Sequence, residues 1–314
     1  MLDILFSADW HIKLGQKNVP IEWQTNRYRT LFEELYKLEN NYSIHIIGGD
    51  IFDSVPTMAE LALFTEYLIG TNKPVWIFSG NHEATKRGAT FFADLEKLLR
   101  PFNHVQVLLG KQTVVVDNYM LDIIPYEDLK SFEPNGFSND ILLTHVRGEI
   151  IPHVKPEIDL SKLDKWKRVF AGDLHSHSNT QRNIVYPGSP VTTSFHRQET
   201  NTGVILFNPS NAEYKWVKLN VPQLIRKTVS SEEEMVRTEF HHTIYELQGD
   251  IKELSKVTKS NPLLDKKVVK RKTDAKLDFS KTDSVRAELA LYLKDVIGIK
   301  DNTAIMGTYD DYST

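Results

Sequence analysis

Short apolar runs, each followed at once by polar side chains, recur along the first 175 residues of the chain. The runs are too short for helices and carry almost no charge, which is typical of buried strands in an α/β sheet. The sequence therefore predicts five buried strands, at residues 2–6, 44–47, 75–78, 141–143 and 169–170.

Segments with apolar residues at helical spacing alternate with the first of these strands. We expect three helices there, at residues 25–40, 57–69 and 90–99. Thr57 is the expected N-cap of the second helix. The buried face of that helix is expected to carry Met58, Leu61, Ala62, Leu68 and Ile69.

From Val105 the pattern becomes rich in β-structure and helical spacing is rare. Alternating strands and helices followed by a β-rich half predict an α/β fold, arranged as a four-layer α-β-β-α sandwich. Further strands are expected at residues 105–109, 113–116, 120–124, 184–186, 204–207 and 214–218.

The organisation changes near Pro222. Residues 224–272 again alternate strand and helix patterns, with helices expected at 231–240 and 251–258, and this predicts a small α/β domain. The tail after the last apolar helix is polar, and we expect it to be loosely held. We divide the chain into a large domain (1–220), a small domain (221–273), a linker (274–281), a helix (282–298) and a polar tail (299–314).

The composition is that of an ordinary soluble globular protein, with 40% hydrophobic and 25% charged residues among 314. The absence of cysteine excludes disulfides and thiolate metal sites. No segment has the length of a membrane span and no signal peptide is visible, so we expect a cytoplasmic protein. The net charge of −4 neither favours nor excludes nucleic acid as a partner, because local patches decide that.

The polar residues that follow the five strands are of metal-binding types. Ligands gather outside the carboxyl ends of strands in such sheets, so these side chains are expected to meet in one small volume. Each motif alone is weak evidence, since Asp and Asn are routine turn residues. Together they predict a metal site built from Asp9, His11, Asp50, Asn81, His82, His145, Asp173 and His175.

The order of these motifs resembles the calcineurin-like metallophosphoesterases. Asp9-x-His11, Gly49-Asp50-x-x-Asp53 and Gly80-Asn81-His82-Glu83 are followed by a lone His145 and by Gly172-Asp173-x-His175. Within that family the chain looks most like the DNA-repair nuclease branch called Mre11 or SbcD. The match includes Ser7-Ala8-Asp9-Trp10-His11 and Tyr186-Pro187-Gly188-Ser189-Pro190, and the small domain resembles the capping domain of that branch.

The resemblance implies two divalent metal ions, one held by Asp9, His11, Asp50 and His175, the other by Asp50, Asn81, His145 and Asp173. Oxygen and imidazole ligands suit Mn²⁺, Fe or Zn²⁺ better than Mg²⁺, and among these the resemblance favours Mn²⁺. By the same resemblance His82 is the general acid that protonates the leaving oxygen. One position departs from the family pattern, which usually has His where this chain has Asp173, and this puts the second metal in doubt.

Basic residues and helices suggest partners. The resemblance implies a homodimer formed through the helices at 57–69 and 90–99, and docking of the helix Thr282–Ile297 onto an SbcC/Rad50-like ATPase. Residues 252–286 hold eleven Lys and Arg against five Asp and Glu, which favours a DNA-backbone contact from the small domain. Further candidate DNA contacts are Lys13, Arg87, Arg147, His196 and Arg197.

We therefore expect a Mn²⁺-dependent DNA exonuclease and endonuclease that acts on double-strand ends and hairpins. Two alternatives remain open. One is a phosphatase or cyclic-nucleotide phosphodiesterase of the same fold, although protein phosphatases of this fold carry Arg where Ser54-Val55-Pro56 follows here. The other is a catalytically weak scaffold that binds DNA ends, which only Asp173 favours.

Overall fold

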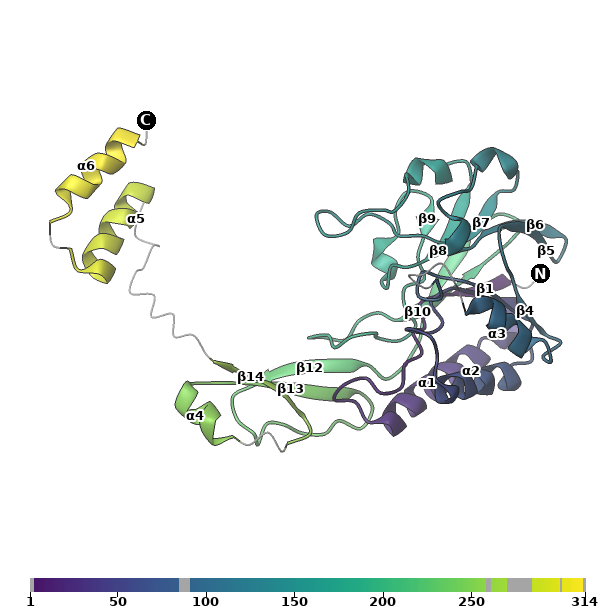
Figure 1. Cartoon of the computed structure of the whole chain (residues 1–314), viewed down its shortest axis with the longest axis horizontal. Helices are drawn as coiled ribbons and strands as arrows, with labels where there is room; N and C mark the ends of the chain where they lie inside the picture. The colour runs from purple at the N-terminus through teal and green to yellow at the C-terminus, as the bar shows by residue number, and fades with distance from the viewer. Residues whose placement is uncertain (1–2, 85–90, 258–260, 270–283, 300, 313–314) are drawn as a thin grey trace.

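The computed structural model describes residues 3–84, 91–257, 261–269, 284–299 and 301–312 (Figure 1). Two mixed sheets form the larger domain, and a third, smaller sheet follows along the chain. Within the described ranges, no helix has both the length and the apolar character that a membrane crossing requires.

Parallel strands dominate both large sheets. In the first sheet, β1 to β4 run parallel, and β10 and β11 are added antiparallel beyond β1. In the second sheet, β6 to β9 run parallel, and β5 pairs antiparallel with β6. The first sheet, in spatial order, consists of β11 (Tyr214–Lys218), β10 (Gly203–Phe207), β1 (Asp3–Ser7), β2 (Tyr42–Gly48), β3 (Val75–Phe78) and β4 (Val105–Val107). The second consists of β5 (Gln112–Val116), β6 (Tyr119–Ile124), β7 (Ile141–His145), β8 (Arg168–Gly172) and β9 (Ile184–Val185).

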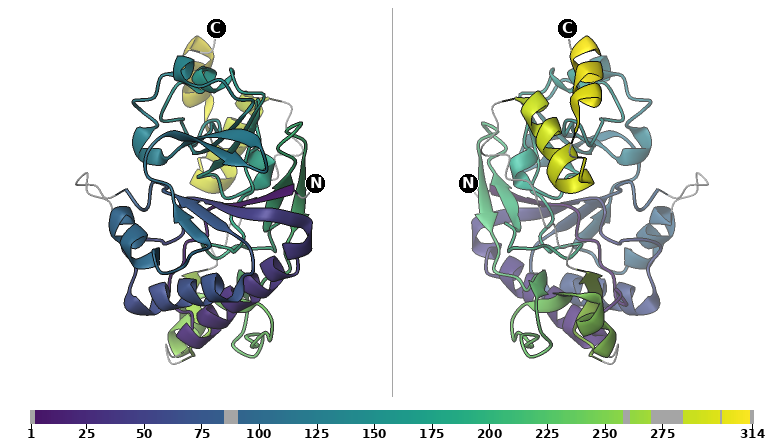
Figure 2. Two further views of the ribbon diagram at one scale, coloured as in Figure 1. Left: turned by 90° about the vertical axis from the view of Figure 1, so that its right-hand side faces the viewer. Right: turned by 90° about the vertical axis from the view of Figure 1, so that its left-hand side faces the viewer.

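The two sheets pack face to face and bury a shared apolar core that includes Phe6, Phe78 and Phe170. Helices α1 (Ile21–Tyr36), α2 (Met58–Gly70) and α3 (Phe92–Leu99) lie along the outer face of the first sheet, as Figure 2 shows. Short 3-10 helices and loops cover the outer face of the second sheet and bury Phe132 and Trp166. The predicted α/β sandwich is therefore confirmed, although its fourth layer is made of 3-10 helices and loops.

Helix α2 buries a different face from the one predicted. Thr57 caps it as expected, because its hydroxyl accepts the Glu60 N–H and the Glu60 carboxylate accepts the Thr57 N–H. Met58 and Ile69 are 81% and 69% exposed and Ala62 is exposed too, so the predicted face is wrong at these positions, whereas Leu68 is buried and Leu61 packs against the core as predicted. Apolar residues surround much of this helix, and their spacing alone does not identify the buried side. The buried residues are Glu60, Leu63, Phe64, Tyr67 and Leu68.

The small domain contains three parallel strands, β12 (Leu224–Val229), β13 (His242–Gly249) and β14 (Leu264–Val269). Helix α4 (Ile251–Lys256) packs on one face of this sheet through Leu254. Turns and irregular backbone occupy residues 231–240, so the helix predicted there is wrong.

The chain ends in two short helices rather than one. Helix α5 (Val285–Tyr292) continues into a π-helical turn at Leu293–Ile297, and α6 (Thr303–Tyr312) follows. A bidentate ion pair joins Arg286 of α5 to Asp310 of α6. The expected loose polar tail is therefore largely helical. Figure 1 draws both helices apart from the three sheets, whereas the predicted linker and Thr282 lie outside the described residues.

Candidate metal centre

The loops that follow β1, β2, β3, β7 and β8 meet at one edge of the sandwich, where the carboxyl ends of these parallel strands lie. One hydrogen bond joins the two sheets there, because Nδ1 of His145 lies 2.9 Å from the carbonyl oxygen of Gly48. This arrangement agrees with the prediction that side chains from separate strand ends lie close together in one small volume. The residues brought together are Asp9, His11, Asp50, Asp53, Asn81, His82, His145 and His175.

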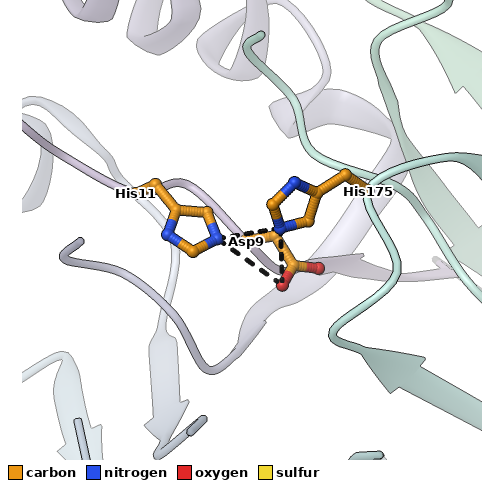
Figure 3. Close-up of side chains that lie close together, drawn as sticks. All are labelled: Asp9, His11 and His175. Atoms are coloured by element: carbon orange, nitrogen blue, oxygen red, sulfur yellow. Dashed lines mark hydrogen bonds and ion pairs between the residues drawn. The ribbon is translucent and has the colours of Figure 1, made fainter. Parts of the chain in front are cut away.

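Asp9, His11 and His175 form one group of possible metal ligands (Figure 3). Nε2 of His11 and Nε2 of His175 each lie 4.0 Å from Oδ1 of Asp9. The two Nε2 atoms are 3.0 Å apart, and Oδ2 of Asp50 lies 3.6 Å from Nε2 of His11. Donor atoms of Asp9, His11 and His175 therefore form one cluster, and Asp50 lies beside it next to His11.

The histidines of this group favour the neutral state. Burial lowers the pKa of His11 to about 3 and also lowers the pKa of His175. Nδ1 of His175 lies 3.1 Å from the hydroxyl of Thr193, whereas the buried Nδ1 of His11 has no hydrogen-bond partner. Neutral imidazoles beside carboxylates are the donor set of a divalent transition metal, so these residues fit such an ion.

Asp50, Asn81 and His145 form a second group beside the first. Nε2 of His145 lies 2.9 Å from Oδ1 of Asn81 and 3.5 Å from Oδ2 of Asp50. The Gly48 carbonyl can only accept a hydrogen bond, so it fixes the proton on Nδ1 of His145 and aims Nε2 at the group. Burial alone would lower the pKa of His145, but the charges of Asp50 and other nearby carboxylates raise it well above its ordinary value. The position therefore attracts positive charge.

Glycines make room for the His145 ring. A Cβ atom on Gly172 would lie 2.5 Å from Nδ1 of His145 and 2.7 Å from the Gly48 oxygen. A Cβ on Gly49 would lie 2.7 Å from the same Nδ1. The absence of a side chain at Gly49 and Gly172 therefore leaves the space that the His145 imidazole occupies.

Four polar residues of the site have left-handed backbone conformations. The φ angles are 58° at Asp9, 45° at His11, 51° at Asp50 and 98° at Asp173. Residues other than glycine rarely adopt such angles, and each costs of order 1 kcal/mol or more. The surrounding fold therefore holds these side chains in place against an unfavourable backbone preference.

Glu83 ties two of the loops together. Its carboxylate is fully buried and accepts hydrogen bonds from the N–H groups of Asp50 (2.9 Å), Ile51 (2.8 Å), Phe52 (3.3 Å) and Gly80 (2.8 Å). Burial and the charge of Asp50 raise the pKa of Glu83 to about 7. The sequence motif includes this residue, and its contacts show that it orients the backbone around Asp50 and Gly80.

His82 lies at the rim of the site and remains partly exposed. Its backbone N–H donates to Oδ1 of Asp50 (2.9 Å), and its Nδ1 lies 2.6 Å from the carbonyl oxygen of Asp53. This hydrogen bond turns Nε2 toward the cluster, 3.9 Å from Oδ2 of Asp50. The imidazole is therefore fixed by a hydrogen bond at Nδ1, and the side chain remains partly accessible to solvent.

Asp173 lies differently from its predicted place among the second group of ligands. Its carboxylate faces Arg147 in a bidentate ion pair, with both N···O distances at 3.1 Å. Within the described part of the chain, none of the clusters able to hold a metal includes Asp173. Among the described residues, Asp9, His11 and His175 fit one three-donor cluster, and Asp9, Asp50 and His145 fit a neighbouring one.

The candidate DNA contacts are mostly paired with acidic residues. Lys13 lies 2.5 Å from a carboxylate oxygen of Asp53, and Arg197 pairs with Glu246. The backbone of His196 bridges to β12, and the residue is half-buried. Arg87 lies outside the described residues.

Two hydroxyl residues near the site escaped the sequence analysis. Thr193 contacts His175, and Ser189 donates a 2.6 Å hydrogen bond to the carbonyl oxygen of Asp9. Ser189 stands in the Pro-Gly-Ser-Pro motif, which was a signal for its position near the site. No pattern in the sequence distinguishes Thr193 from other surface threonines.

Comparisons with known proteins agree with this geometry. The family model of the calcineurin-like phosphoesterases matches residues 2–207. The chain is 40% identical over 307 residues to the "Probable exonuclease subunit 1" of Escherichia phage T5, covering 93% of this chain and 92% of that protein. It is 25% identical over 231 residues to the "Putative phosphoesterase 244L" of Invertebrate iridescent virus 6, covering 67% and 78%. A solved structure from Thermus thermophilus is 9% identical, with a TM-score of 0.46 over 70% of this chain and 100% of that one.

Proposed function

Because this chain belongs to the calcineurin-like phosphoesterase family, whose members use divalent metal ions, we propose that it is a metal-dependent nuclease of the Mre11/SbcD type. One observation carries the proposal, namely the convergence of donors from Asp9, His11, Asp50 and His175 beside the imidazole of His82. The extended similarity to a phage exonuclease subunit supports DNA as the substrate.

Mn²⁺ is the proposed metal, since carboxylate and imidazole donors together suit it better than Mg²⁺. The proposed ligands are Asp9, His11 and His175, which form one cluster, together with Asp50, whose Oδ2 lies 3.6 Å from Nε2 of His11. A bound divalent ion lowers the pKa of a water molecule and stabilises negative charge on a phosphate.

Side chains of the protein are proposed to position the groups of the site and to protonate the leaving oxygen. His82 is the proposed general acid, because its Nδ1 is fixed by the Asp53 carbonyl and its Nε2 faces the cluster from an accessible rim. Asn81 and His145 present an amide oxygen and an imidazole nitrogen from the opposite side of Asp50. Glu83 accepts hydrogen bonds from the N–H groups of Asp50 and Gly80, and so holds the loop of Asp50 beside the loop that carries His82.

The small domain is proposed to contact the DNA backbone. Arg226 and Lys266 of this domain, together with Arg197 of the large domain, surround the carboxylates of Glu246 and Asp265, so the cluster carries an excess positive charge. The side chains of Arg197 and Lys266 are 59% and 55% exposed. Cations of this kind bind phosphates without reading the sequence.

Protein partners are proposed for two surfaces. Helices α2 and α3 expose Met58, Ile69 and Leu98, which favours a homodimer contact through these helices. Helix α5 and the π-helical turn that follows it expose Val285, Tyr292 and Ile297, and the segment Thr282–Ile297 is the proposed docking element for an SbcC/Rad50-like ATPase. The word "subunit" in the name of the phage relative supports an assembly.

DNA degradation by the purified chain tests the proposal. Linear double-stranded DNA and hairpins are incubated with Mn²⁺, Mg²⁺ or EDTA, beside Asp50→Ala and His82→Ala variants. We expect cleavage with Mn²⁺, loss of cleavage in Asp50→Ala, and a decrease of about 100-fold or more in His82→Ala. Hydrolysis of small phosphate esters without DNA cleavage would favour the phosphatase or cyclic-nucleotide phosphodiesterase alternative. DNA binding without cleavage, even with the ATPase present, would favour the scaffold.

A further inference from the structure

The pairing of Asp173 with Arg147 changes the chemistry at the edge of the metal centre. The Asp173 side chain is only 5% exposed, and both of its carboxylate oxygens face the guanidinium. Its backbone N–H donates to Oδ1 of Asp9 at 3.0 Å, which keeps it beside the proposed ligands. A carboxylate engaged at both oxygens by Arg is a poor candidate for a metal ligand, because the two cations would compete for it.

Arg147 is held from several sides. It follows His145 by two residues, and its backbone N–H donates to Oε1 of Glu157 at 3.1 Å. The other oxygen of Glu157 accepts a 3.2 Å hydrogen bond from the hydroxyl of Tyr126. Glu157 therefore fixes the backbone of Arg147, and Asp173 fixes its guanidinium.

The fixed guanidinium keeps binding capacity on its outer side. Its side chain is 39% exposed, and the ion pair uses Nε and Nη2. A guanidinium has five N–H donors, so three remain for another acceptor. Arg suits phosphate in particular, because its planar donors match the oxygens of a phosphoryl group.

We propose that Asp173 is an anchor for Arg147 and that the Arg147 guanidinium binds a phosphate oxygen of the substrate beside the metal centre. The inference rests on the proposed phosphodiesterase function and deepens it. In this view a fixed positive charge stands where the family pattern has a metal-binding imidazole. Arg147 contacts the substrate, whereas Asp173 is a positioning residue that acts through Arg147.

Metal binding tests the role of Asp173 independently of activity. Mn²⁺ is titrated calorimetrically into the wild type and into Asp173→Gly, a replacement that suits the φ of 98° and removes every side-chain donor. We expect the same number of ions and affinities within 3-fold in both proteins. Loss of one ion from Asp173→Gly, or a 10-fold weaker affinity, would show that Asp173 is a metal ligand and would overturn the proposal.

Substrate binding tests the role of Arg147. The probe is bis(p-nitrophenyl) phosphate, a small diester that does not require a DNA-binding surface, and kcat and KM are measured with Mn²⁺. Arg147→Gln is expected to raise KM about 10-fold, Asp173→Gly to raise it less, and the double variant to match Arg147→Gln. The matched control is Arg182→Gln, because Arg182 forms a similar bidentate pair with Asp164 at the opposite ends of the strands.

The outcomes separate this inference from the proposed nuclease function. Hydrolysis of the diester without DNA cleavage, with the expected KM pattern, would refute the nuclease and retain the role of Arg147. An unchanged KM in Arg147→Gln, or an equal rise in Arg182→Gln, would overturn the role of Arg147. A wild type that neither hydrolyses the diester nor is protected from thermal unfolding by inorganic phosphate would overturn both.

Discussion

Replacing Glu83 by Gln is expected to damage stability and metal binding together. In the folded chain Oε2 of Glu83 accepts the N–H groups of Asp50 and Gly80, while Oε1 accepts those of Ile51 and Phe52. A glutamine keeps one accepting oxygen and turns the other into a donor. Two buried N–H groups then face an NH₂ group and have no acceptor.

The magnitude follows from the number of hydrogen bonds lost. A buried polar group without a partner costs about 1–3 kcal/mol, so two such groups predict a decrease of roughly 2–6 kcal/mol in the free energy of unfolding. The displaced loop carries Asp50, whose carboxylate lies close to His11 and His145. Changes in the groups that orient metal ligands typically weaken metal affinity about 10- to 100-fold, and we expect the same here for Mn²⁺.

Urea unfolding and Mn²⁺ calorimetry on the same preparations measure the two effects. The matched control is Asp122→Asn, because Asp122 is also a buried carboxylate and accepts hydrogen bonds from Thr113, Asn139 and Trp166 away from the site. It should lower stability without changing Mn²⁺ affinity. A loss of less than about 1 kcal/mol in Glu83→Gln, or an unchanged Mn²⁺ affinity, would refute the reasoning.

Three further changes have defined outcomes. Burial lowers the pKa of His45 to about 3, so only the unfolded chain takes up this proton below its ordinary value of 6.5. The free energy of unfolding should therefore fall by about 1.4 kcal/mol between pH 7.5 and 5.5 on account of this residue, and urea titrations of His45→Gln should lack that component. Thr57→Ala removes the cap of α2 and should cost about 1 kcal/mol; an unchanged urea midpoint would contradict this. Gly172→Ala places a methyl group against His145 and should cost about 1–3 kcal/mol while weakening Mn²⁺ binding, measured as for Glu83→Gln.

The sequence predicts the strands well because their apolar runs end abruptly. The strands predicted at Val75–Phe78 and Tyr214–Lys218 agree with β3 and β11 to the residue. The same abrupt ends place polar residues at the carboxyl edge, so the gathering of side chains around Asp50 followed from topology alone. Physical rules for parallel sheets thus carry most of the prediction of the site.

Features that depend on packing between distant segments were not predictable. The buried side of α2 is fixed by the sheet beneath it, and its own spacing of apolar residues is ambiguous. Helix α6 is joined to α5 by the ion pair of Arg286 with Asp310, and these two residues are 24 positions apart in the sequence. Residues 231–240 have helical spacing, yet their backbone is irregular.

The ion pair of Arg147 with Asp173 shows the same limit within the site. The two residues are 26 positions apart, and the sequence around each of them predicts only a loop. Motif spacing identifies which residues follow which strands. It does not show whether a carboxylate faces a metal position or a neighbouring guanidinium.

The left-handed backbone of the site has a consequence for the evolution of the chain. Glycine would relieve the unfavourable φ angles at Asp9, His11 and Asp50, at the cost of a side chain that the proposed chemistry needs. It would also remove negative charges that lie close together at Asp9 and Asp50. Selection for stability alone would therefore erode these positions, and a lineage that no longer needed the enzyme should lose them before it loses the fold.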